Sequence, residues 1–231
     1  MTTASGRGVE VLAALVDPAS TAVLTMELQR GVVGEDAMMQ ALAEQVAAAG
    51  TVRAAAAVCD AARDVGARVV HCVVQTRADG AGGAVNCRIL GLADKLRREQ
   101  GIAPTLAGSD GARLVPELGD DSRDLIAARG HGLTPFTSTS LDQTLRNLGV
   151  TTVVATGVSV NVGVMGLCLS AVDLGYQVVL VRDAVAGVPA GYAESVIEHS
   201  LAMVATVVTS SELLEAWAQR PSLRGRGPSG P

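Results

Sequence analysis

The stretch Val153-Val-Ala-Thr-Gly-Val-Ser-Val-Asn-Val-Gly-Val-Met-Gly166 begins as a short apolar run and passes through Gly157 into a helical pattern. Such a run is typical of a strand that is buried on both faces of a parallel sheet. Asn161 can cap the helix that follows. Free N–H groups at a helix start favour negative charge, so this elbow is a candidate site for a carboxylate ligand or a developing oxyanion. A plain turn between a strand and a helix is the simpler alternative.

Strands and helices alternate on both sides of the elbow. Strands are predicted at 21–26, 68–74, 124–129, 151–156, 177–181 and 206–209, and helices at 35–66 with a break at Gly50, 141–148, 161–174, 190–203 and 211–218. Right-handed crossovers place such strands in one sheet with helices on both faces. We therefore predict an α/β fold with a doubly wound, mostly parallel sheet in three layers.

The domain organisation follows from the length of 231 residues, 48% of them hydrophobic and 18% charged. This composition is that of a folded chain with a substantial core. We predict a single domain at 19–219, a flexible N-terminal segment at 1–18 and a disordered C-terminal tail at 220–231. The few charges leave apolar helix faces to be covered between subunits, which predicts a homo-oligomer.

Charge and composition also exclude classes of partner. The net charge of −5 and the four aromatic residues disfavour nucleic-acid binding. We expect no membrane partner, because apolar runs stay far below the ~20 residues that span a bilayer. The polar N-terminus does not resemble a signal peptide, so a cytoplasmic location is expected.

Cofactor and metal motifs are absent from the sequence. No Gly-x-Gly-x-x-Gly follows the first strand and no Gly-x-x-x-x-Gly-Lys-Ser/Thr occurs, so we predict no nucleotide cofactor. The three histidines are scattered and the four cysteines form no Cys-x-x-Cys pair, so we also predict no metal. The histidines inside predicted elements, His71 and His199, are interpreted as structural, and the cysteines as reduced thiols. Cys168 falls on a different helix face from Gly163.

Polar residues that follow the predicted strands are candidates for a site, because ligands bind at the carboxyl ends of strands in such sheets. Glu27 follows the first strand and Arg77 the second, while Arg129 and His131 stand at the end of the third. A Gly-rich segment between Gln75 and Leu90 is too long for a simple connector, so we expect it to lie over the site.

The order of four segments resembles the isochorismatase-like hydrolase superfamily from about Ala22 to Trp217. The segments are Val23-Leu-Thr-Met-Glu-Leu-Gln29, the Val-Val-His strand with a downstream Arg, Phe136-Thr-Ser-Thr-Ser-Leu141, and the elbow followed by Ala171-Val-Asp-Leu-Gly-Tyr-Gln-Val and Asp183-Ala-Val-Ala. The resemblance implies a parallel sheet flanked by helices, a cytosolic homodimer or homotetramer, and a cis peptide bond at Val158–Ser159.

The sequence departs from the catalytic set that this resemblance implies. Glu27 stands where the family carries Asp, Gly130 where it carries Lys, and Gly163 where it carries the nucleophilic Cys. Gly163 has no side chain with which to attack a carbonyl, so covalent cysteine catalysis at this position is excluded. Isochorismatases proper also carry Gly there, and they protonate a vinyl ether with the acid of the first strand.

The resulting prediction is a Cys-independent hydrolase of secondary metabolism that acts on a small anionic metabolite with a vinyl ether, amide or lactone bond. Glu27 is the predicted general acid/base, since a carboxyl group enclosed by apolar neighbours retains its proton more readily. His131 is the second catalytic candidate, as a proton shuttle. The predicted substrate-binding residues are Arg129, Gln29, Arg77, Arg88, Phe136, Ser159, Asn161 and Gly163.

The alternative is a non-catalytic member that keeps the pocket for a ligand or partner. The space between Glu27 and Gly163 separates the two predictions. An enclosed polar cavity favours the enzyme, whereas a pocket filled by Met26, Leu133 or Met165 favours the binding protein.

Overall fold

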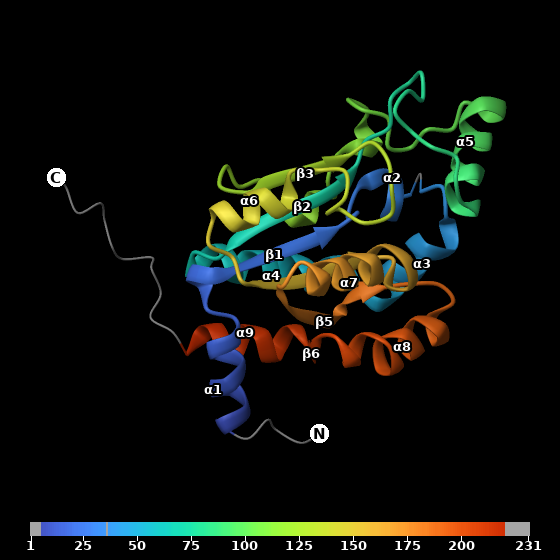
Figure 1. Cartoon of the computed structure of the whole chain (residues 1–231). Helices are drawn as coiled ribbons and strands as arrows, with labels where there is room; N and C mark the ends of the chain where they lie inside the picture. Colours follow the sequence, from blue (N-terminus) through green and yellow to red (C-terminus); the bar gives the residue numbers. More distant parts are fainter. Residues whose placement is uncertain (1–5, 36, 220–231) are drawn as a thin grey trace.

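The described residues of the computed structural model, 6–35 and 37–219, form one six-stranded sheet in which every neighbouring pair is parallel (Figure 1). The strand order is β3-β2-β1-β4-β5-β6. The strands are β1 (Thr21–Met26), β2 (Arg68–Val74), β3 (Leu125–Arg129), β4 (Thr152–Val158), β5 (Gln177–Ala186) and β6 (Thr206–Val208). This arrangement confirms the predicted α/β fold.

Helices cover both faces of this sheet. Residues of α1 (Gly6–Leu15), α3 (Gln40–Ala49), α4 (Thr51–Val65) and α9 (Ser210–Ala218) belong to one hydrophobic core. Residues of α6 (Leu141–Asn147), α7 (Met165–Asp173) and α8 (Ala190–His199) belong to the other. The short α2 (Arg30–Val33) follows β1, and α5 (Arg88–Gln100) projects from the body beyond the ends of β2 and β3 (Figure 1).

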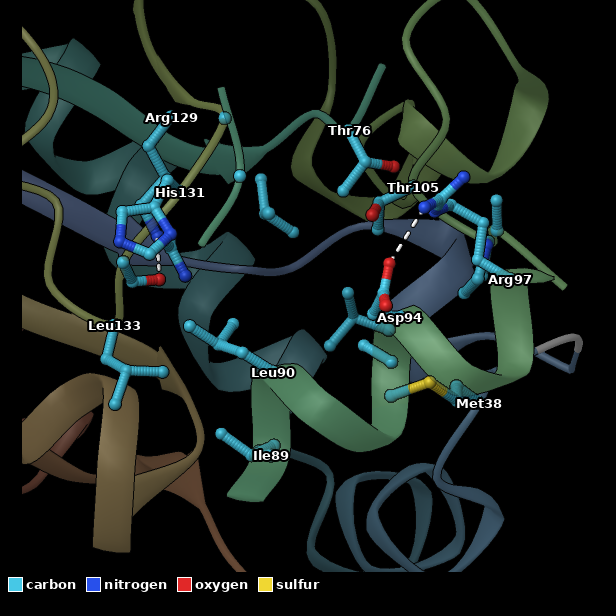
Figure 2. Close-up of a pocket in the computed structure, with 18 of the residues that line it drawn as sticks. Met38, Thr76, Ile89, Leu90, Asp94, Arg97, Thr105, Arg129, His131 and Leu133 are labelled. Carbon is cyan, nitrogen blue, oxygen red and sulfur yellow. Dashed lines mark hydrogen bonds and ion pairs between the residues drawn. The ribbon is translucent and has the colours of Figure 1, made fainter. Parts of the chain in front are cut away.

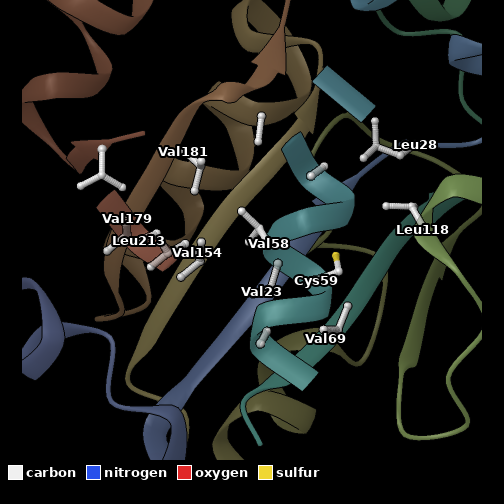
Figure 3. Close-up of a cluster of buried hydrophobic side chains, with 14 of the residues drawn as sticks. Val23, Leu28, Val58, Cys59, Val69, Leu118, Val154, Val179, Val181 and Leu213 are labelled. Carbon is white, nitrogen blue, oxygen red and sulfur yellow. The ribbon is translucent and has the colours of Figure 1, made fainter. Parts of the chain in front are cut away.

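The first core is built from valines of neighbouring strands in register. Val23 of β1 pairs with Val154 of β4, which pairs with Val179 of β5. Val58 of α4 packs over these strands (Figure 3), and all four side chains are fully buried. Full burial of one such side chain stabilises the fold by about 1.5–3 kcal/mol. The central strands are apolar on both faces because both faces are covered.

Two glycines mark backbone conformations that other residues adopt at a cost. Gly50, at φ 67°, separates α3 from α4, as the sequence predicts. Gly157, at φ 102°, passes so close to β1 that an added Cβ would lie 2.1 Å from the Met26 carbonyl oxygen. The elbow therefore needs glycine at this position, and its close approach fixes the end of β4 against the end of β1.

Two segments differ from the prediction. Residues 6–15, expected within a flexible segment, form α1, because Val9, Leu12 and Val16 share one helical face that packs against α9. The Trp217 indole donates to the Val16 carbonyl at 2.9 Å. The second is α5, where only the end of a Gly-rich loop was expected. Residues 1–5 and the predicted tail at 220–231 lie outside the described residues.

None of the described helices has the length and apolar character needed to cross a membrane.

Candidate active site

A cavity of about 260 Å³ opens at the carboxyl ends of the central strands (Figure 2). Its wall includes Glu27 after β1, Thr76 after β2, Arg129 at the end of β3, and Ser159 after β4. Helix α5 closes one side. Parallel α/β sheets bind ligands at this edge, so the topology itself brings these residues together.

Glu27 has an uncommon backbone conformation. Its φ of 52° is the only positive value found among the described non-glycine residues, and its N–H donates to the Cys72 carbonyl at 2.9 Å. Such a conformation costs about 1–3 kcal/mol and persists where the surrounding structure enforces it. The side chain is 19% exposed, faces the cavity and forms an ion pair with Arg129. Glu27 therefore has a charged neighbour, where the sequence suggested an apolar one.

Arg129 is the buried cation of the cavity, with a side chain only 4% exposed. Its Nε donates to the Gly132 carbonyl at 3.1 Å and its Nη2 to Glu27. Its Nη1 is buried and has no partner in the described part of the chain. Burial lowers the pKa of Arg129 to about 10, which still leaves the guanidinium charged at neutral pH. A buried donor without a partner costs about 1–3 kcal/mol.

His131, in the loop after β3, and Arg77, in the Gly-rich segment, both line the cavity. The Nδ1 atom of His131 accepts a hydrogen bond from the Ala84 N–H at 3.2 Å, which ties this segment to the loop after β3. Arg77 lines the cavity with an exposed side chain that pairs with Asp79 at 2.8 Å. Gly80, Ala81, Gly83 and Ala84 of the Gly-rich segment line the same cavity.

The elbow contributes Ser159 and Gly163 to the cavity wall. The Val158–Ser159 peptide bond is cis, as the resemblance implies, and Val160–Val164 form a π-helical turn before α7. The N–H groups of Val162 and Val164 both donate to the Ser159 carbonyl, at 3.1 and 3.0 Å. These two N–H groups already have hydrogen-bond partners. The predicted oxyanion site would therefore have to use other N–H groups of the elbow.

Gly163 faces a filled space. A Cβ added there would lie 3.0 Å from the Met26 Cε and 3.0 Å from the Val158 carbonyl oxygen. Any larger side chain would have to displace its neighbours. The absence of a cysteine side chain at position 163 is therefore matched by the close packing of Met26 and the Val158 carbonyl around this glycine.

Gln29, predicted to bind substrate, instead joins structural segments. Its Nε2 donates to the carbonyls of Val74 and Ala112, both at 2.9 Å, and its Oε1 accepts from the Val74 N–H at 2.8 Å. The side chain is fully buried, and its polar atoms are used in holding β1 to β2 and to the segment around Ala112. The prediction of a substrate contact is corrected accordingly.

Three other predicted contacts also lie outside the wall of the cavity in the described structure. Phe136 is buried in the second core, with its ring centroid 6.0 Å from that of Tyr176. Asn161 donates to the Val188 carbonyl at 3.4 Å. Arg88 is exposed at the first turn of α5. Phe136 and Asn161 are thus engaged by contacts within the fold, and Arg88 faces solvent.

The sequence analysis missed the face of α5 and the side chains opposite it. Ile89, Leu90, Asp94 and Arg97 share one face of this helix and line the cavity. Apolar residues at 89, 93 and 96 have helical spacing, and this signal could have predicted the helix. The further wall residues that were missed include Met38, Thr76 and Thr105.

His71 belongs to a buried polar network beneath the sheet edge and does not line the cavity in the described structure. Its Nδ1 lies 2.8 Å from the Thr25 hydroxyl and its Nε2 3.2 Å from an Asp124 carboxylate oxygen. Arg63 pairs with the same carboxylate at 2.6 Å. Among residues 6–35 and 37–219, no group of three or more His, Cys, Asp or Glu side chains is placed to hold a metal ion.

The chain is similar in sequence to two curated proteins. The uncharacterized isochorismatase family protein YwoC of Bacillus subtilis (strain 168) is 32% identical over 108 residues, which are 46% of this chain and 56% of YwoC. The uncharacterized isochorismatase family protein YecD of Escherichia coli O157:H7 is 33% identical over 114 residues, 46% of this chain and 60% of YecD. The chain thus spans a little over half the length of these curated relatives.

Solved structures match over longer ranges. An isochorismatase family protein from Desulfovibrio vulgaris has a TM-score of 0.73 at 29% identity, covering 86% of this chain and 98% of that one. A cysteine hydrolase from Pseudomonas syringae pv. phaseolicola has a TM-score of 0.72 at 20% identity, covering 89% and 95%, and shares the fold alone. The profile of the isochorismatase domain matches residues 21–212, which is most of the chain. The chain therefore belongs to the isochorismatase family.

Proposed function

We propose that this protein hydrolyses a small anionic metabolite without a cysteine nucleophile. The observation that carries the proposal is the Glu27–Arg129 ion pair in the wall of the cavity. It joins a proton-transfer group to a fixed positive charge at the edge of the sheet where ligands bind. Glu27 and Gly163 both line this cavity, which supports an enzyme, whereas Met26 occupies the space beside Gly163, which supports the non-catalytic alternative.

Arg129 supplies the positive charge that the Gly at position 130 cannot. Its guanidinium is buried, charged and left with one free donor, Nη1. A charged guanidinium donor forms a strong hydrogen bond to a carboxylate oxygen, and it equally stabilises an oxyanion that forms during acyl hydrolysis. We assign Arg129 to the substrate carboxylate or to the developing oxyanion.

Glu27 is the proton-transfer group. The guanidinium beside it favours the ionised carboxylate, so in the free protein Glu27 is a base. With an amide or lactone, Glu27 takes a proton from water while the water oxygen bonds to the carbonyl carbon. The carbonyl electron pair moves to oxygen, and it returns when the bond to the leaving nitrogen or oxygen breaks. Glu27 then gives its proton to that leaving atom.

A vinyl ether requires the opposite order, because Glu27 must first hold the proton that is transferred to carbon. A substrate carboxylate that binds Arg129 would remove the counter-charge of Glu27 and favour its protonated form. Water then adds to the resulting cation while the Glu27 carboxylate takes one of its protons. The hemiketal breaks to ketone and alcohol as its hydroxyl loses a proton and Glu27 gives one to the leaving oxygen. One pair of residues can therefore serve either bond type, and the substrate decides which.

The remaining thiols support a mechanism without cysteine. Cys168 is fully buried, and desolvation raises its pKa to about 12. The reactive form of cysteine is the thiolate, which such a site disfavours. Position 163 is occupied by Gly and backed by Met26, so the elbow presents no thiol at this position.

The proposal is tested by assaying isochorismate first, followed by small carboxylates that carry an amide or lactone. Glu27→Gln keeps the size and hydrogen bonding of the side chain but cannot transfer the proton, so turnover should fall by about 10²–10⁴-fold while substrate affinity changes far less. The matched control is Glu198→Gln, on the exposed surface of α8. If wild type converts none of these compounds, or Glu27→Gln converts them equally well, the hydrolase proposal is wrong. Binding without conversion would favour the non-catalytic alternative.

A further inference from the structure

A second polar cluster lines the end of the cavity that lies away from Arg129 and His131 (Figure 2). Thr76 and Thr105 face it from two adjacent segments, joined by a hydrogen bond from the Thr76 N–H to the Thr105 carbonyl at 2.9 Å. Asp94 and Arg97 face it from α5, as an ion pair of 2.7 Å. The mechanism proposed above uses none of these four residues.

The two threonine hydroxyls are available to a ligand. Thr105 is buried at 8% exposure, and Thr76 is partly buried. Both main-chain polar groups of Thr76 are hydrogen-bonded, because its carbonyl also accepts from the Ala107 N–H at 2.9 Å. Neither hydroxyl has a hydrogen-bond partner within the described ranges, although both residues line the cavity. Each hydroxyl can donate one hydrogen bond and accept others.

The charges of the ion pair balance each other. Arg97 is held in place by its bond to Asp94 and by a contact of 3.4 Å from its Nη1 to the Ala78 carbonyl. Asp94 and Arg97 are only 20% and 24% exposed. Arg98 approaches Asp94 from the solvent side with a side chain 66% exposed. Arg98 does not line the cavity, whereas the Asp94–Arg97 pair does, and this pair offers hydrogen-bond donors and acceptors without net charge, which suits a neutral group.

Apolar side chains separate the two polar ends. Leu90 lies between them in Figure 2, Met38 lies below Asp94 at the far end, and Ile89 and Leu133 continue the apolar wall. A ligand that fills the cavity is thus expected to have a charged end, an apolar middle and a neutral polar end. The buried polar groups of the wall should select for such a ligand. A ligand that lacks the matching polar group would leave them without hydrogen-bond partners.

Resting on the proposed function, we propose that Thr76, Thr105 and the Asp94–Arg97 pair form a distal subsite that binds a hydroxyl group of the substrate. The hydroxyl would donate to Asp94 and accept from a threonine hydroxyl. The substrate class is accordingly a hydroxylated carboxylate with an apolar spacer, whose carboxylate is held by Arg129.

The test measures binding of nine simple carboxylates by calorimetry. Benzoate, phenylacetate and 3-phenylpropanoate provide three spacer lengths, each with hydrogen, hydroxyl or methyl in the para position. For at least one length, wild type should bind the hydroxyl compound about 5- to 10-fold more tightly than the methyl compound, the usual effect of one hydrogen bond. Thr76→Val and Thr105→Val together should abolish this preference and leave the affinity for the unsubstituted compound within about twofold.

Two controls separate the subsite from the rest of the site. Thr206→Val, on the far edge strand, should keep the preference for hydroxyl. Arg129→Met should weaken all nine compounds together. Equal binding of hydroxyl and methyl compounds at all three lengths, or a preference that survives in the folded double valine variant, overturns the subsite while leaving the Arg129 site intact. Failure of all nine carboxylates to bind rejects both the subsite and the anion site at Arg129.

Discussion

Glu27 and Arg129 form a buried ion pair although they are 102 residues apart in the sequence and follow strands that do not touch. β2 lies between β1 and β3, so the two side chains meet across its end. Glutamate is one methylene longer than the aspartate that the family resemblance implies, and arginine is longer than lysine. Arg129 stands one residue before Gly130, the position at which the resemblance implies lysine, and it places a positive charge beside Glu27.

Removing one partner of this pair tests how far the fold depends on it. Arg129→Met leaves Glu27 without its counter-ion at 19% exposure, and the free energy of unfolding in urea should fall by about 2–4 kcal/mol. Arg182→Met is the matched control, because Arg182 and Glu194 also form an ion pair but are 43% and 46% exposed. Its effect should stay within about 1 kcal/mol. Equal losses in the two variants would mean that the Glu27–Arg129 pair is no more than a surface contact.

A methyl group at position 163 should destabilise the protein. In Gly163→Ala the new Cβ meets Met26 and the Val158 carbonyl, and overpacking of this kind costs about 1–3 kcal/mol in the free energy of unfolding. Gly191→Ala is the control, since an added Cβ there meets no described atom within 4 Å and alanine favours the helix.

The cause can be assigned with a second substitution. If Met26 is the obstacle, Met26→Ala combined with Gly163→Ala should be more stable than the sum of the two single effects, because the neighbours share one space. Strictly additive effects would assign the strain to the Val158 carbonyl instead.

His71 should make stability depend on pH. Burial lowers the pKa of His71 below its ordinary 6.5, against the opposing effect of Asp124, so the folded protein holds it neutral. The unfolded chain binds a proton below about pH 6.5, which makes stability complete above that pH and reduces it as pH falls further. The loss per pH unit is at most about 1.4 kcal/mol for one proton.

This dependence can be isolated by urea unfolding at pH 7.5, 6.5 and 5.5. His71→Gln should lose less stability than wild type between pH 6.5 and 5.5, since it has no proton to bind. His199→Gln should behave like wild type, because His199 is exposed at the end of α8. A slope unchanged by His71→Gln would show that other groups carry the acid sensitivity.

The four cysteines should differ sharply in reactivity. Desolvation by burial raises the pKa of Cys59, Cys72 and Cys168 to about 12, whereas Cys87 is exposed before α5. Iodoacetamide should therefore modify the native protein once, at Cys87, and the unfolded protein four times, as counted by mass spectrometry. Activity should survive the single modification. Rapid labelling of Cys168 with loss of turnover would restore the possibility of cysteine catalysis.

Local sequence determined most of the elements of this fold. The apolar runs at 21–26 and 68–74 coincide with β1 and β2. Gly50 separates α3 from α4 and has the left-handed conformation that favours glycine. These features depend on neighbours within a few residues, so composition and periodicity reveal them. Glu27 could be predicted as the candidate acid from local sequence as well. The residue that follows a strand of a parallel α/β sheet lies at the edge where ligands bind, and Glu27 follows β1.

Tertiary structure alone decided which candidate side chains meet. Gln29 and Glu27 are two residues apart after the same strand. The side chain of Gln29 makes hydrogen bonds to the main chain, whereas that of Glu27 faces the cavity. The charge beside Glu27 comes from β3, and the opposite wall comes from α5, whose exposed, mixed sequence gives only a weak helical signal. Side-chain direction and counter-charge depend on contacts between segments about a hundred residues apart, and these contacts exist only once the sheet has assembled.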